Sequence, residues 1–347
     1  MYIKKILLFI VLIGLVIGGA FSYMVYSAIF SPNTKFNNGE AHIYLASNSS
    51  FEDVKTSLRP LLEDMDSFEA VAQRKGYISN IKGGKYRLTK GMNNNEIVNS
   101  LRSNNIPIKV SFNNQETLAN LAGRISTQIE ADSISLLKAF NDTDFLSANN
   151  FNDANKLAMY VPNSYEFFWN TSAERFRDKM LREYHRFWNN DRLQKAKQLG
   201  LTPPEVVSLA SIVHKETAKV DERPRVAGVY LNRLGKGILL QADPTVIYAL
   251  KLHNGDFNKV YKRVLYKDLE LDSPYNTYKY SGLPPGPIAM PDISAIDAVL
   301  NPEKHDYYYF VANVENFGYH KFARTLSQHN RNKEQYIRWV NAQNIKR

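Results

Sequence analysis

The chain opens with a long apolar run. Residues Ile6 to about Phe30 include no charged side chain, and Lys4 and Lys5 stand directly before them. A helix needs roughly 20 apolar residues to cross the hydrocarbon core of a membrane, and flanking lysines tend to stay on the cytoplasmic side. We therefore predict one transmembrane helix within residues 1–30, with the rest of the chain exported.

A cleaved signal peptide is the alternative to this anchor. Gly18-Gly19-Ala20 offers a weak cleavage point, and the apolar core of a signal peptide is typically about 7–15 residues long. The run stays apolar from Phe21 to Phe30, with tyrosines suited to a membrane interface, so the uncleaved anchor is favoured. No later segment is apolar for long enough to span again, which predicts a single-pass protein.

Shorter elements follow the anchor. Residues 31–40 are polar and rich in turn-forming types, which indicates a linker. In residues 41–105 the apolar spacing predicts a strand, two helices, a second strand and a third helix. This β-α-α-β-α order resembles a small glycan-binding LysM-like module. A packing domain without a ligand is the alternative.

Residues 106–347 mix further strands and helices, so the chain is predicted to have an α+β fold. A strand is expected at Ile106 to Phe112 and another at Ile238 to Gln241, and the chain should end in a hairpin and a helix. The aromatic-rich segment from Tyr160 to Trp169 contains Pro and Asn and is a poor helix former. Its aromatic side chains either belong to the core or form a wall on which sugar rings stack.

One predicted helix carries a carboxylate on its apolar face. The helix starts at Thr202 with a capping box and a proline in its first turn. Glu216 follows Val213 by three residues and Leu209 by seven, so it continues the apolar stripe of this helix. Apolar surroundings disfavour the charged form of a carboxylate and raise its pKa, as the proton-donating acid of a glycosidase requires.

Two alternatives concern the acidic residues of this region. A buried Glu216 that pairs with Arg223 or Arg225 fits the same spacing equally well. Asp243 is the best candidate for a second carboxylate, because two carboxyls flank the bond in glycoside hydrolases. It stands immediately before Pro244 at a predicted helix start, however, where an aspartate is a common N-terminal cap, and this is its favoured role. The Pro- and Gly-rich loop at residues 282–288 has little freedom and could wall a cleft.

The amino-acid composition excludes several kinds of catalytic and metal-binding site. The 347 residues include no cysteine, which removes thiolate zinc sites and cysteine nucleophiles. The histidines lack the spacing of a zinc-protease helix, and we predict neither a metal nor another cofactor. The net charge of +10 favours polyanionic partners. The positive charges are spread along the chain without a nucleic-acid recognition motif, so nucleic acid is not an expected partner.

Several short motifs follow one another along the chain. They are GKYR at residues 84–87, VPNSYEF at 161–167, and then LASIVHKET, ERPRVAGVYLNRL, LQADPTVIY, YNTY, GLPPGPI and HKF…SQHN. Together with the apolar amino terminus, these motifs resemble the endolytic murein transglycosylase (MltG/YceG-like) family over nearly the whole chain.

The resemblance implies a lyase that cleaves nascent peptidoglycan glycan strands between MurNAc and GlcNAc. Such a lytic transglycosylase leaves a 1,6-anhydroMurNAc end rather than adding water, and it limits strand length during cell-wall synthesis. The resemblance assigns Glu216 as the catalytic acid and base, on a helix of a mixed α/β catalytic domain at residues 106–347. The family motif commonly has an acidic residue where this chain has His214, a change that alters the local charge.

The resemblance also implies a glycan groove and a location. The protein would be a single-pass protein of the cell inner membrane, with its catalytic domain on the periplasmic (extracytoplasmic) side and peptidoglycan synthases as partners. The lytic reaction needs no second carboxylate, in agreement with the cap role for Asp243. The candidates to line the groove, by position in the motifs, are Gln241, Asp243, Thr245, Asn276, Tyr278 and His320.

Two other functions compete with this interpretation. A muramidase would use the same site but add water, and the chemistry of the products would separate the two. A non-catalytic scaffold protein would bind the cell wall and place synthesis enzymes at the membrane. The scaffold is disfavoured because a pure binding protein has no use for a carboxylate on an apolar helix face.

Overall fold

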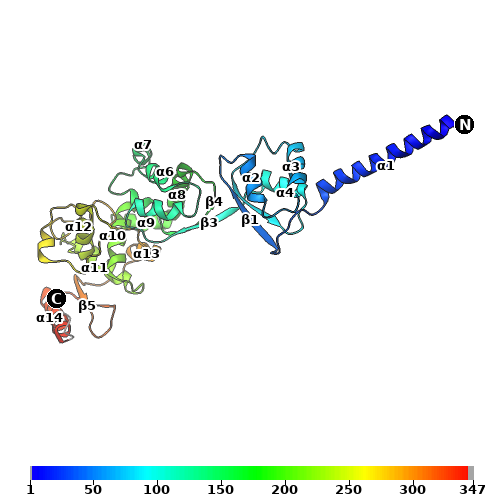
Figure 1. The fold of residues 1–347 in the computed structure, drawn as a ribbon. Coiled ribbons are helices and arrows are strands. Elements are labelled where there is room, and N and C mark those ends of the chain that lie inside the picture. The colour runs from blue at the N-terminus through cyan, green and yellow to red at the C-terminus, as the bar shows by residue number, and fades with distance from the viewer. Residues whose placement is uncertain (1, 343–347) are drawn as a thin grey trace. The chain divides into compact units, whose positions relative to one another are not determined.

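The computed structural model describes residues 2–342, and the chain forms two compact units (Figure 1). The first unit contains the chain up to Val110 and two short later segments, 128–131 and 165–172. The second unit contains the remainder. The local order of strands and helices in the sequence does not indicate that these two later segments return to the first unit.

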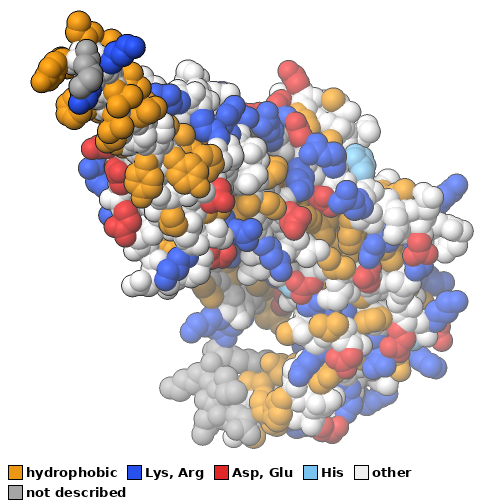
Figure 2. Space-filling view, turned by 90° about the vertical axis from the view of Figure 1, so that its right-hand side faces the viewer, with side chains coloured by type: hydrophobic (Ala, Val, Ile, Leu, Met, Phe, Trp, Pro, Cys, Tyr) orange, Lys and Arg blue, Asp and Glu red, His pale blue; other side chains and the backbone are white. Residues whose placement is uncertain are grey.

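The first unit begins with the apolar helix α1 (Tyr2–Phe30), which is long and apolar enough to cross a membrane. Most of its side chains are exposed, and Figure 2 shows hydrophobic side chains gathered along it. Its last turn differs, because the carbonyl of Ala28 accepts a hydrogen bond of 2.8 Å from the amide of Asn94. Ile29 also packs against the core of the first unit. The end of the anchor helix is therefore part of the folded unit.

Residues 31–40, which composition indicates to be a linker, make ordered contacts with the first unit. Asn33 is buried, and its side-chain amide donates to the carbonyl of Asp64 at 2.7 Å and to Asn94 at 2.6 Å. Isolated bridges join Pro32 to Asn93 and Thr34 to Leu62. Because buried amide hydrogen bonds fix both partners, this segment is held in place.

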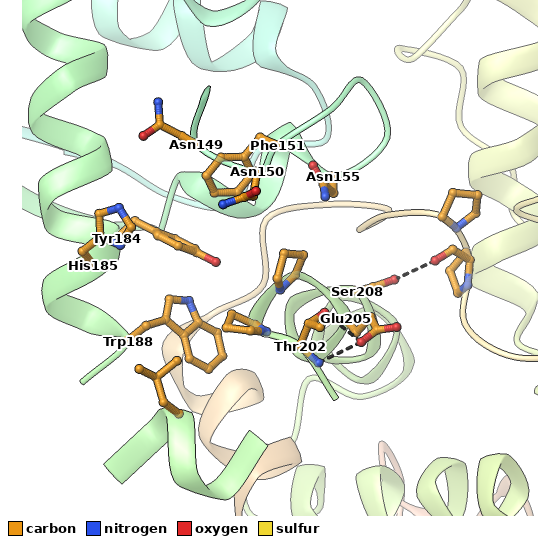
Figure 3. A pocket seen from close by; sticks show the side chains of 15 residues that line it. Asn149, Asn150, Phe151, Asn155, Tyr184, His185, Trp188, Thr202, Glu205 and Ser208 are labelled. Carbon is orange, nitrogen blue, oxygen red and sulfur yellow. Dashed lines mark hydrogen bonds between the residues drawn. The ribbon is translucent and has the colours of Figure 1, made fainter. Parts of the chain in front are cut away.

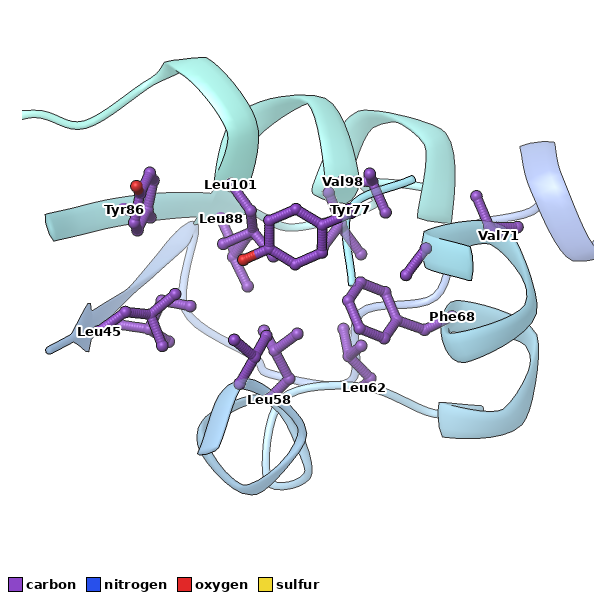
Figure 4. Packing of buried hydrophobic residues seen from close by; sticks show 14 residues of the cluster. Leu45, Leu58, Leu62, Phe68, Val71, Tyr77, Tyr86, Leu88, Val98 and Leu101 are labelled. Atoms are coloured by element: carbon purple, nitrogen blue, oxygen red, sulfur yellow. The ribbon is translucent and has the colours of Figure 1, made fainter. Parts of the chain in front are cut away.

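The rest of the first unit has the β-α-α-β-α order expected from the apolar spacing. Its two strands are antiparallel, and the helices cover one apolar cluster with them (Figure 4). Capping boxes at Ser50 and Asn93 start two of the helices. The elements are β1 (Glu40–Leu45), α2 (Phe51–Leu58), α3 (Met65–Arg74), β2 (Gly84–Thr89) and α4 (Asn94–Ser103).

Strand β3 (Pro107–Phe112) pairs with β4 (Asn163–Phe168) in a two-stranded sheet. The aromatic-rich segment at residues 160–169 thus contributes a strand. Tyr160 and Phe167 from it are buried, whereas Phe168 is exposed. The other elements before residue 200 are α5 (Leu118–Ser126), α6 (Ser133–Phe140), α7 (Thr143–Ala148), the 3-10 turn η1 (Lys156–Met159), α8 (Ala173–Phe187) and α9 (Asn190–Gln198).

Helix α10 (Pro203–Glu216) is the centre of the second unit. It packs against α11 (Arg223–Gly235), α12 (Asp243–Asn254) and α13 (Ile293–Leu300), and every residue from Val206 to Val213 is buried. After α12 come the 3-10 turn η2 (Tyr266–Glu270) and the loop that leads to α13. The chain then forms the expected hairpin, β5 (Tyr309–Ala312) with β6 (His320–Ala323), and the expected helix, α14 (Leu326–Ala342).

The strand predicted at residues 238–241 is absent from the described structure. The segment is irregular, and Gln241 has a left-handed φ of 52° that breaks an extended run. The buried Arg233 guanidinium donates to the carbonyls of Leu239 at 3.0 Å and Leu240 at 2.7 Å. These carbonyls are satisfied by a side chain, so the segment needs no partner strand.

Gly228 lets α11 approach the chain that precedes β5. A Cβ at this position would lie 2.6 Å from the backbone oxygen of Glu303 and 2.7 Å from the ring of His305. Gly235, in the same helix, has no atom within 4 Å of its Cβ position. The two glycines therefore form a matched pair.

We expect Gly228→Ala to lower the free energy of unfolding by about 1–3 kcal/mol, because the added methyl group overpacks against backbone. Gly235→Ala should be neutral or raise it by up to about 1 kcal/mol, because alanine favours the helix. Thermal unfolding of both variants of the full chain in detergent measures the difference. Equal stability of the two variants would contradict the close approach at Gly228.

Candidate active site

Glu216 is the last residue of α10, a helix whose position is fixed at both ends. The backbone N–H and the hydroxyl of Thr202 both contact the Glu205 carboxylate at 2.7 Å, which closes the capping box at the first turn. Pro203 and Pro204 occupy the first turn. After Glu216 the chain leaves the helix, since Thr217 has an extended conformation.

Tyr230 on α11 holds the carboxyl group of Glu216. Its hydroxyl donates to Oε1 of Glu216 at 2.6 Å. Burial raises the pKa of Glu216 to about 7, and the charge of Asp243 raises it as well, while the Tyr230 hydrogen bond and the charges of His320 and Arg233 lower it. Burial has the largest effect. Glu216 can therefore carry a proton near neutral pH and release it there.

The interpretation of Glu216 as half of a buried ion pair is wrong. Arg223 pairs with Asp292 at 3.1 Å, and Arg225 pairs with Glu303 at 2.9 Å. The two arginines that could neutralise Glu216 are thus used by other carboxylates. Neither arginine offsets the burial of Glu216, and the opposing effects of Tyr230, His320 and Arg233 on its pKa are each smaller than that of burial.

The carboxyl group of Glu216 opens into a cavity of about 360 Å³. Segments far apart in the sequence build it: the ends of α10 and α11, the loop before α12, Tyr278, strand β5 and helix α14. Ionisable and hydroxyl-bearing side chains predominate in its lining, together with a few apolar ones. Lining residues are Glu216, Tyr230, Arg233, Leu240, Gln241, Asp243, Tyr278, Tyr308, Tyr309, Phe310, His329 and Lys333.

Asp243 does not cap α12, contrary to the favoured role from sequence. The N-cap residue is Ala242, and Asp243 is the first residue of the helix itself. Its Oδ1 accepts a hydrogen bond of 2.6 Å from the hydroxyl of Tyr278. The side chain of Asp243 lies in the cavity lining because it bonds to a residue 35 positions later in the chain, a tertiary contact that local spacing does not encode.

The other groove candidates divide into two groups. Gln241 and Tyr278 line the cavity with Asp243. Thr245 and Asn276 are fully buried and line no part of it. The Thr245 hydroxyl donates to the carbonyl of Ala242 at 2.7 Å, and the Asn276 amide donates to the backbone carbonyls of Leu269 in η2 and Leu271 just after it. These two residues therefore hold the loops that carry the lining side chains.

His320 also lies outside the cavity lining. Its backbone N–H and ring Nδ1 contact the buried Glu222 carboxylate at 2.6 and 2.9 Å. Its influence on the site is electrostatic, since its charge lowers the pKa of Glu216. His214 points to a different cluster, with Nδ1 at 3.3 Å from Asp292 and 3.2 Å from Arg223, and burial lowers the pKa of His214.

Arg233 is a cavity residue that the sequence reasoning missed. It is 7 % exposed, and its guanidinium donates to the backbone carbonyls of Tyr308, Leu239 and Leu240. A signal was present, because Arg233 follows Val226 by seven residues and Tyr230 by three. It thus continues the apolar face of α11 as Glu216 continues that of α10. Tyr308, Tyr309, Phe310, His329 and Lys333 carried no local signal of this kind.

The raised pKa of Glu216 predicts a pH-dependent cost to stability. Below pH 4.5, the pKa of this carboxyl in the unfolded chain, Glu216 is protonated in both the folded and the unfolded state. Between pH 4.5 and about 7 only the folded state keeps the proton. The free energy of unfolding therefore falls as the pH rises through this window. We expect Glu216→Gln to match the parent near pH 4 and to exceed its free energy of unfolding at pH 8 by up to about 3 kcal/mol.

Thermal unfolding across pH 4–8 tests this expectation on the full chain in detergent. Glu334→Gln removes an exposed carboxylate from α14 and is the matched control, which should follow the parent at every pH. A constant difference between Glu216→Gln and the parent across the range would refute burial as the cause of the shift.

Comparisons with known proteins agree on one family. The chain matches the YceG-like family over residues 43–335. It is 31% identical to a protein of Bacillus subtilis named endolytic murein transglycosylase, over 93% of this chain and 91% of that protein. A Streptococcus pneumoniae protein of the same name is 26% identical, over 97% of this chain and 65% of that protein.

A solved structure supports the same assignment. The crystal structure of a YceG-like protein of Listeria monocytogenes superposes with a TM-score of 0.55 at 29% identity, covering 85% of this chain and 99% of that chain. The family match at residues 43–335 includes most of the first unit after its anchor helix and every residue that lines the cavity at Glu216. The chain belongs to the YceG-like family.

Proposed function

We propose that this protein is an endolytic murein transglycosylase. It cleaves peptidoglycan glycan strands between MurNAc and GlcNAc and leaves 1,6-anhydroMurNAc ends. The observation that carries the proposal is the half-buried Glu216 carboxyl group, whose pKa is raised to about 7 in a cavity lined by polar side chains. The names of the relatives from Bacillus subtilis and Streptococcus pneumoniae support the same reaction class.

In the proposed mechanism Glu216 acts twice. It first donates its proton to the glycosidic oxygen as the bond from that oxygen to C1 of MurNAc breaks. The resulting carboxylate then accepts the proton of the C6 hydroxyl as O6 bonds to C1. The proton that Glu216 gives to the leaving oxygen is replaced by the proton of the C6 hydroxyl, so no water is consumed and Glu216 returns to its protonated state. A pKa near 7 suits both steps, because a group that serves as acid and base works best close to the operating pH.

Other cavity residues have roles that fit this chemistry. Tyr230 fixes the orientation of the Glu216 carboxyl through Oε1, which leaves Oε2 for the proton transfer. Positive charge develops on the sugar ring as the bond breaks. Asp243 lines the same cavity and can stabilise that charge, as can the substrate's own acetamido group. Gln241 and Tyr278 are the remaining candidates for direct contact with the glycan.

The proposal includes a location and partners. α1 anchors the protein as a single-pass membrane protein of the inner membrane, and Lys4 and Lys5 keep the short amino terminus cytoplasmic. The catalytic domain at residues 106–347 then faces the periplasmic (extracytoplasmic) side. The β-α-α-β-α order of residues 41–105 supports a LysM-like module. Beside peptidoglycan synthases, the enzyme limits the length of new strands.

Product analysis tests the reaction. The full chain in detergent is incubated with purified murein, and the products are identified by mass spectrometry. We expect 1,6-anhydromuramoyl products from the parent, and a rate at least about 100-fold lower from Glu216→Gln, because general acid-base catalysis contributes about 10²–10⁴-fold. The amide keeps the shape of the side chain but cannot donate and recover a proton.

Each contrary result has a definite meaning. Reducing-end products would show that water attacks, and the protein would be a muramidase. Intact glycan with parent and variant alike would overturn the enzymatic proposal in favour of a wall-binding scaffold.

The role of Tyr230 predicts a change in the pH–rate profile. Tyr230→Phe removes the hydrogen bond that lowers the pKa of Glu216, so that pKa rises. Activity is lost as pH rises through this pKa, so the alkaline limb of the profile should move to higher pH. The maximal rate should fall about 10-fold because the carboxyl is no longer held in one orientation.

Tyr280→Phe is the matched control. Its hydroxyl also donates to a carboxylate, Asp272, at 2.6 Å, but Tyr280 lies outside the cavity lining. This variant should keep both the rate and the profile of the parent. A Tyr230→Phe profile that falls in height without moving would contradict the proposed contact with the titrating group.

A further inference from the structure

A second cavity lies at the opposite end of α10 from Glu216. It has a volume of about 590 Å³ and receives Thr202, Pro203 and Ser208 from the first turns of that helix (Figure 3). Pro203 and Glu216 are the first and last residues of the helix, and a rise of 1.5 Å per residue separates them by about 20 Å. The second cavity is therefore distinct from the candidate active site.

Rigid apolar groups form the walls of this cavity. Phe151, Tyr184 and Trp188 supply three aromatic rings, and prolines come from α10 and from the loop at residues 282–288. The rings of Phe151 and Tyr184 are in edge contact with centroids 5.3 Å apart. Gly286 and Pro284 bind the hydroxyl of Ser208 through their carbonyls, which fixes this loop on α10. The walls thus require little ordering when a ligand enters.

One buried polar atom of this lining has no hydrogen-bond partner among the described residues. It is the indole Nε1 of Trp188, a residue that is only 4 % exposed. In Figure 3 this nitrogen and the hydroxyl of Tyr184 point into the same space, and the amide of Asn150 faces it from the other side. Asn150 has a φ of 61°, in the left-handed region. A buried donor without a partner is costly, and a bound ligand that accepts from it removes this cost.

The lining is close to neutral. Its ionisable side chains are His185, which is exposed, Glu205, which is engaged in the capping box with Thr202, and the buried Tyr184. This contrasts with the cavity at Glu216, whose lining includes Asp243, Arg233 and Lys333. A neutral ligand fits such a site better than an anionic or cationic one, because a buried charge without a partner is disfavoured.

We propose that this cavity binds an uncleaved N-acetylhexosamine unit of a glycan strand. The inference rests on the proposed function for its choice of ligand. An N-acetylated sugar is neutral, presents C–H groups that pack on aromatic and proline walls, and carries acetamido and hydroxyl oxygens. Those oxygens accept from the Tyr184 hydroxyl and the Asn150 amide, and a small turn of the indole brings the buried Trp188 Nε1 within reach of one of them. The site holds a strand at a second point, remote from the bond that Glu216 cleaves.

Fluorine NMR of the full chain in detergent, labelled with 5-fluorotryptophan, reads out this cavity directly. The protein has three tryptophans. The signal that disappears in Trp188→Phe belongs to Trp188. If Trp188→Phe does not fold, the signals that disappear in Trp169→Phe and in Trp339→Phe are assigned instead, and the remaining signal is that of Trp188. Chitotetraose is the probe, since it is neutral and lacks peptide and muramic acid. We expect a saturable shift of the Trp188 signal, and a much smaller one with cellotetraose, which lacks acetamido groups.

Two tyrosine variants form a matched pair for this experiment. Tyr184→Phe removes the hydroxyl that faces the cavity and should weaken chitotetraose binding about 3- to 10-fold. Tyr160→Phe removes a buried hydroxyl that likewise has no partner among the described residues but does not line this cavity, and it should leave binding unchanged. Asn150→Gly tests the third contact, because glycine accepts the left-handed backbone of this position.

The outcomes separate this inference from the proposed function. A Trp188 signal that does not respond to chitotetraose refutes the second site, even if murein is cleaved at Glu216. An equal response to cellotetraose overturns the choice of an N-acetylated sugar. If the Trp188 signal responds to chitotetraose alone and murein is not cleaved, the second site is supported and the proposed reaction is refuted.

Discussion

The chemistry of the second unit depends on a carboxyl group kept partly out of water. Glu216 continues the apolar face of α10, and the folded chain gives it a tyrosine hydroxyl rather than a cation as its partner. An arginine paired directly with Glu216 would favour the ionised carboxylate, which cannot donate a proton. The chain keeps Arg223 and Arg225 occupied with Asp292 and Glu303 instead. These two ion pairs keep both arginines away from Glu216, so that neither arginine lowers its pKa.

Helix α10 joins two different environments. At its last turn, ionisable side chains surround Glu216; at its first turn, prolines and aromatic rings surround a nearly neutral space. Between them the helix is buried, and Ser208 and Ser211 bind the loop at residues 282–288 to its side. Because every residue from Val206 to Val213 is enclosed, the distance between the two cavities is fixed by regular helix geometry.

Sequence periodicity predicted the parts of this structure that are local. It located α10, the placement of Glu216 on its apolar face, the order of elements in residues 41–105 and the final hairpin and helix. It failed where a partner distant in the sequence decides the outcome. Asp243 has the spacing of a helix cap, yet Tyr278 binds its side chain. Thr245 and Asn276 belong to motifs, yet burial gives them a structural role.

Arg233 has the same kind of position in its helix as Glu216. Arg233 continues the apolar face of α11 in the way that Glu216 continues the face of α10, and both line the cavity. A charged residue on an apolar stripe is thus informative wherever it occurs. The residues of β5 and α14 offered no such pattern, because their contribution arises only when the end of the chain folds back on the helices before it.

The wall that β5 and α14 add to the cavity has a consequence for local unfolding. Tyr309 and Phe310 in β5 and His329 and Lys333 in α14 line the cavity at Glu216. Helix α14 packs on β5 and β6, whereas α10 packs on α11, α12 and α13. Local opening of the hairpin and α14 would therefore expose Glu216 to water while the helix that carries it stays folded.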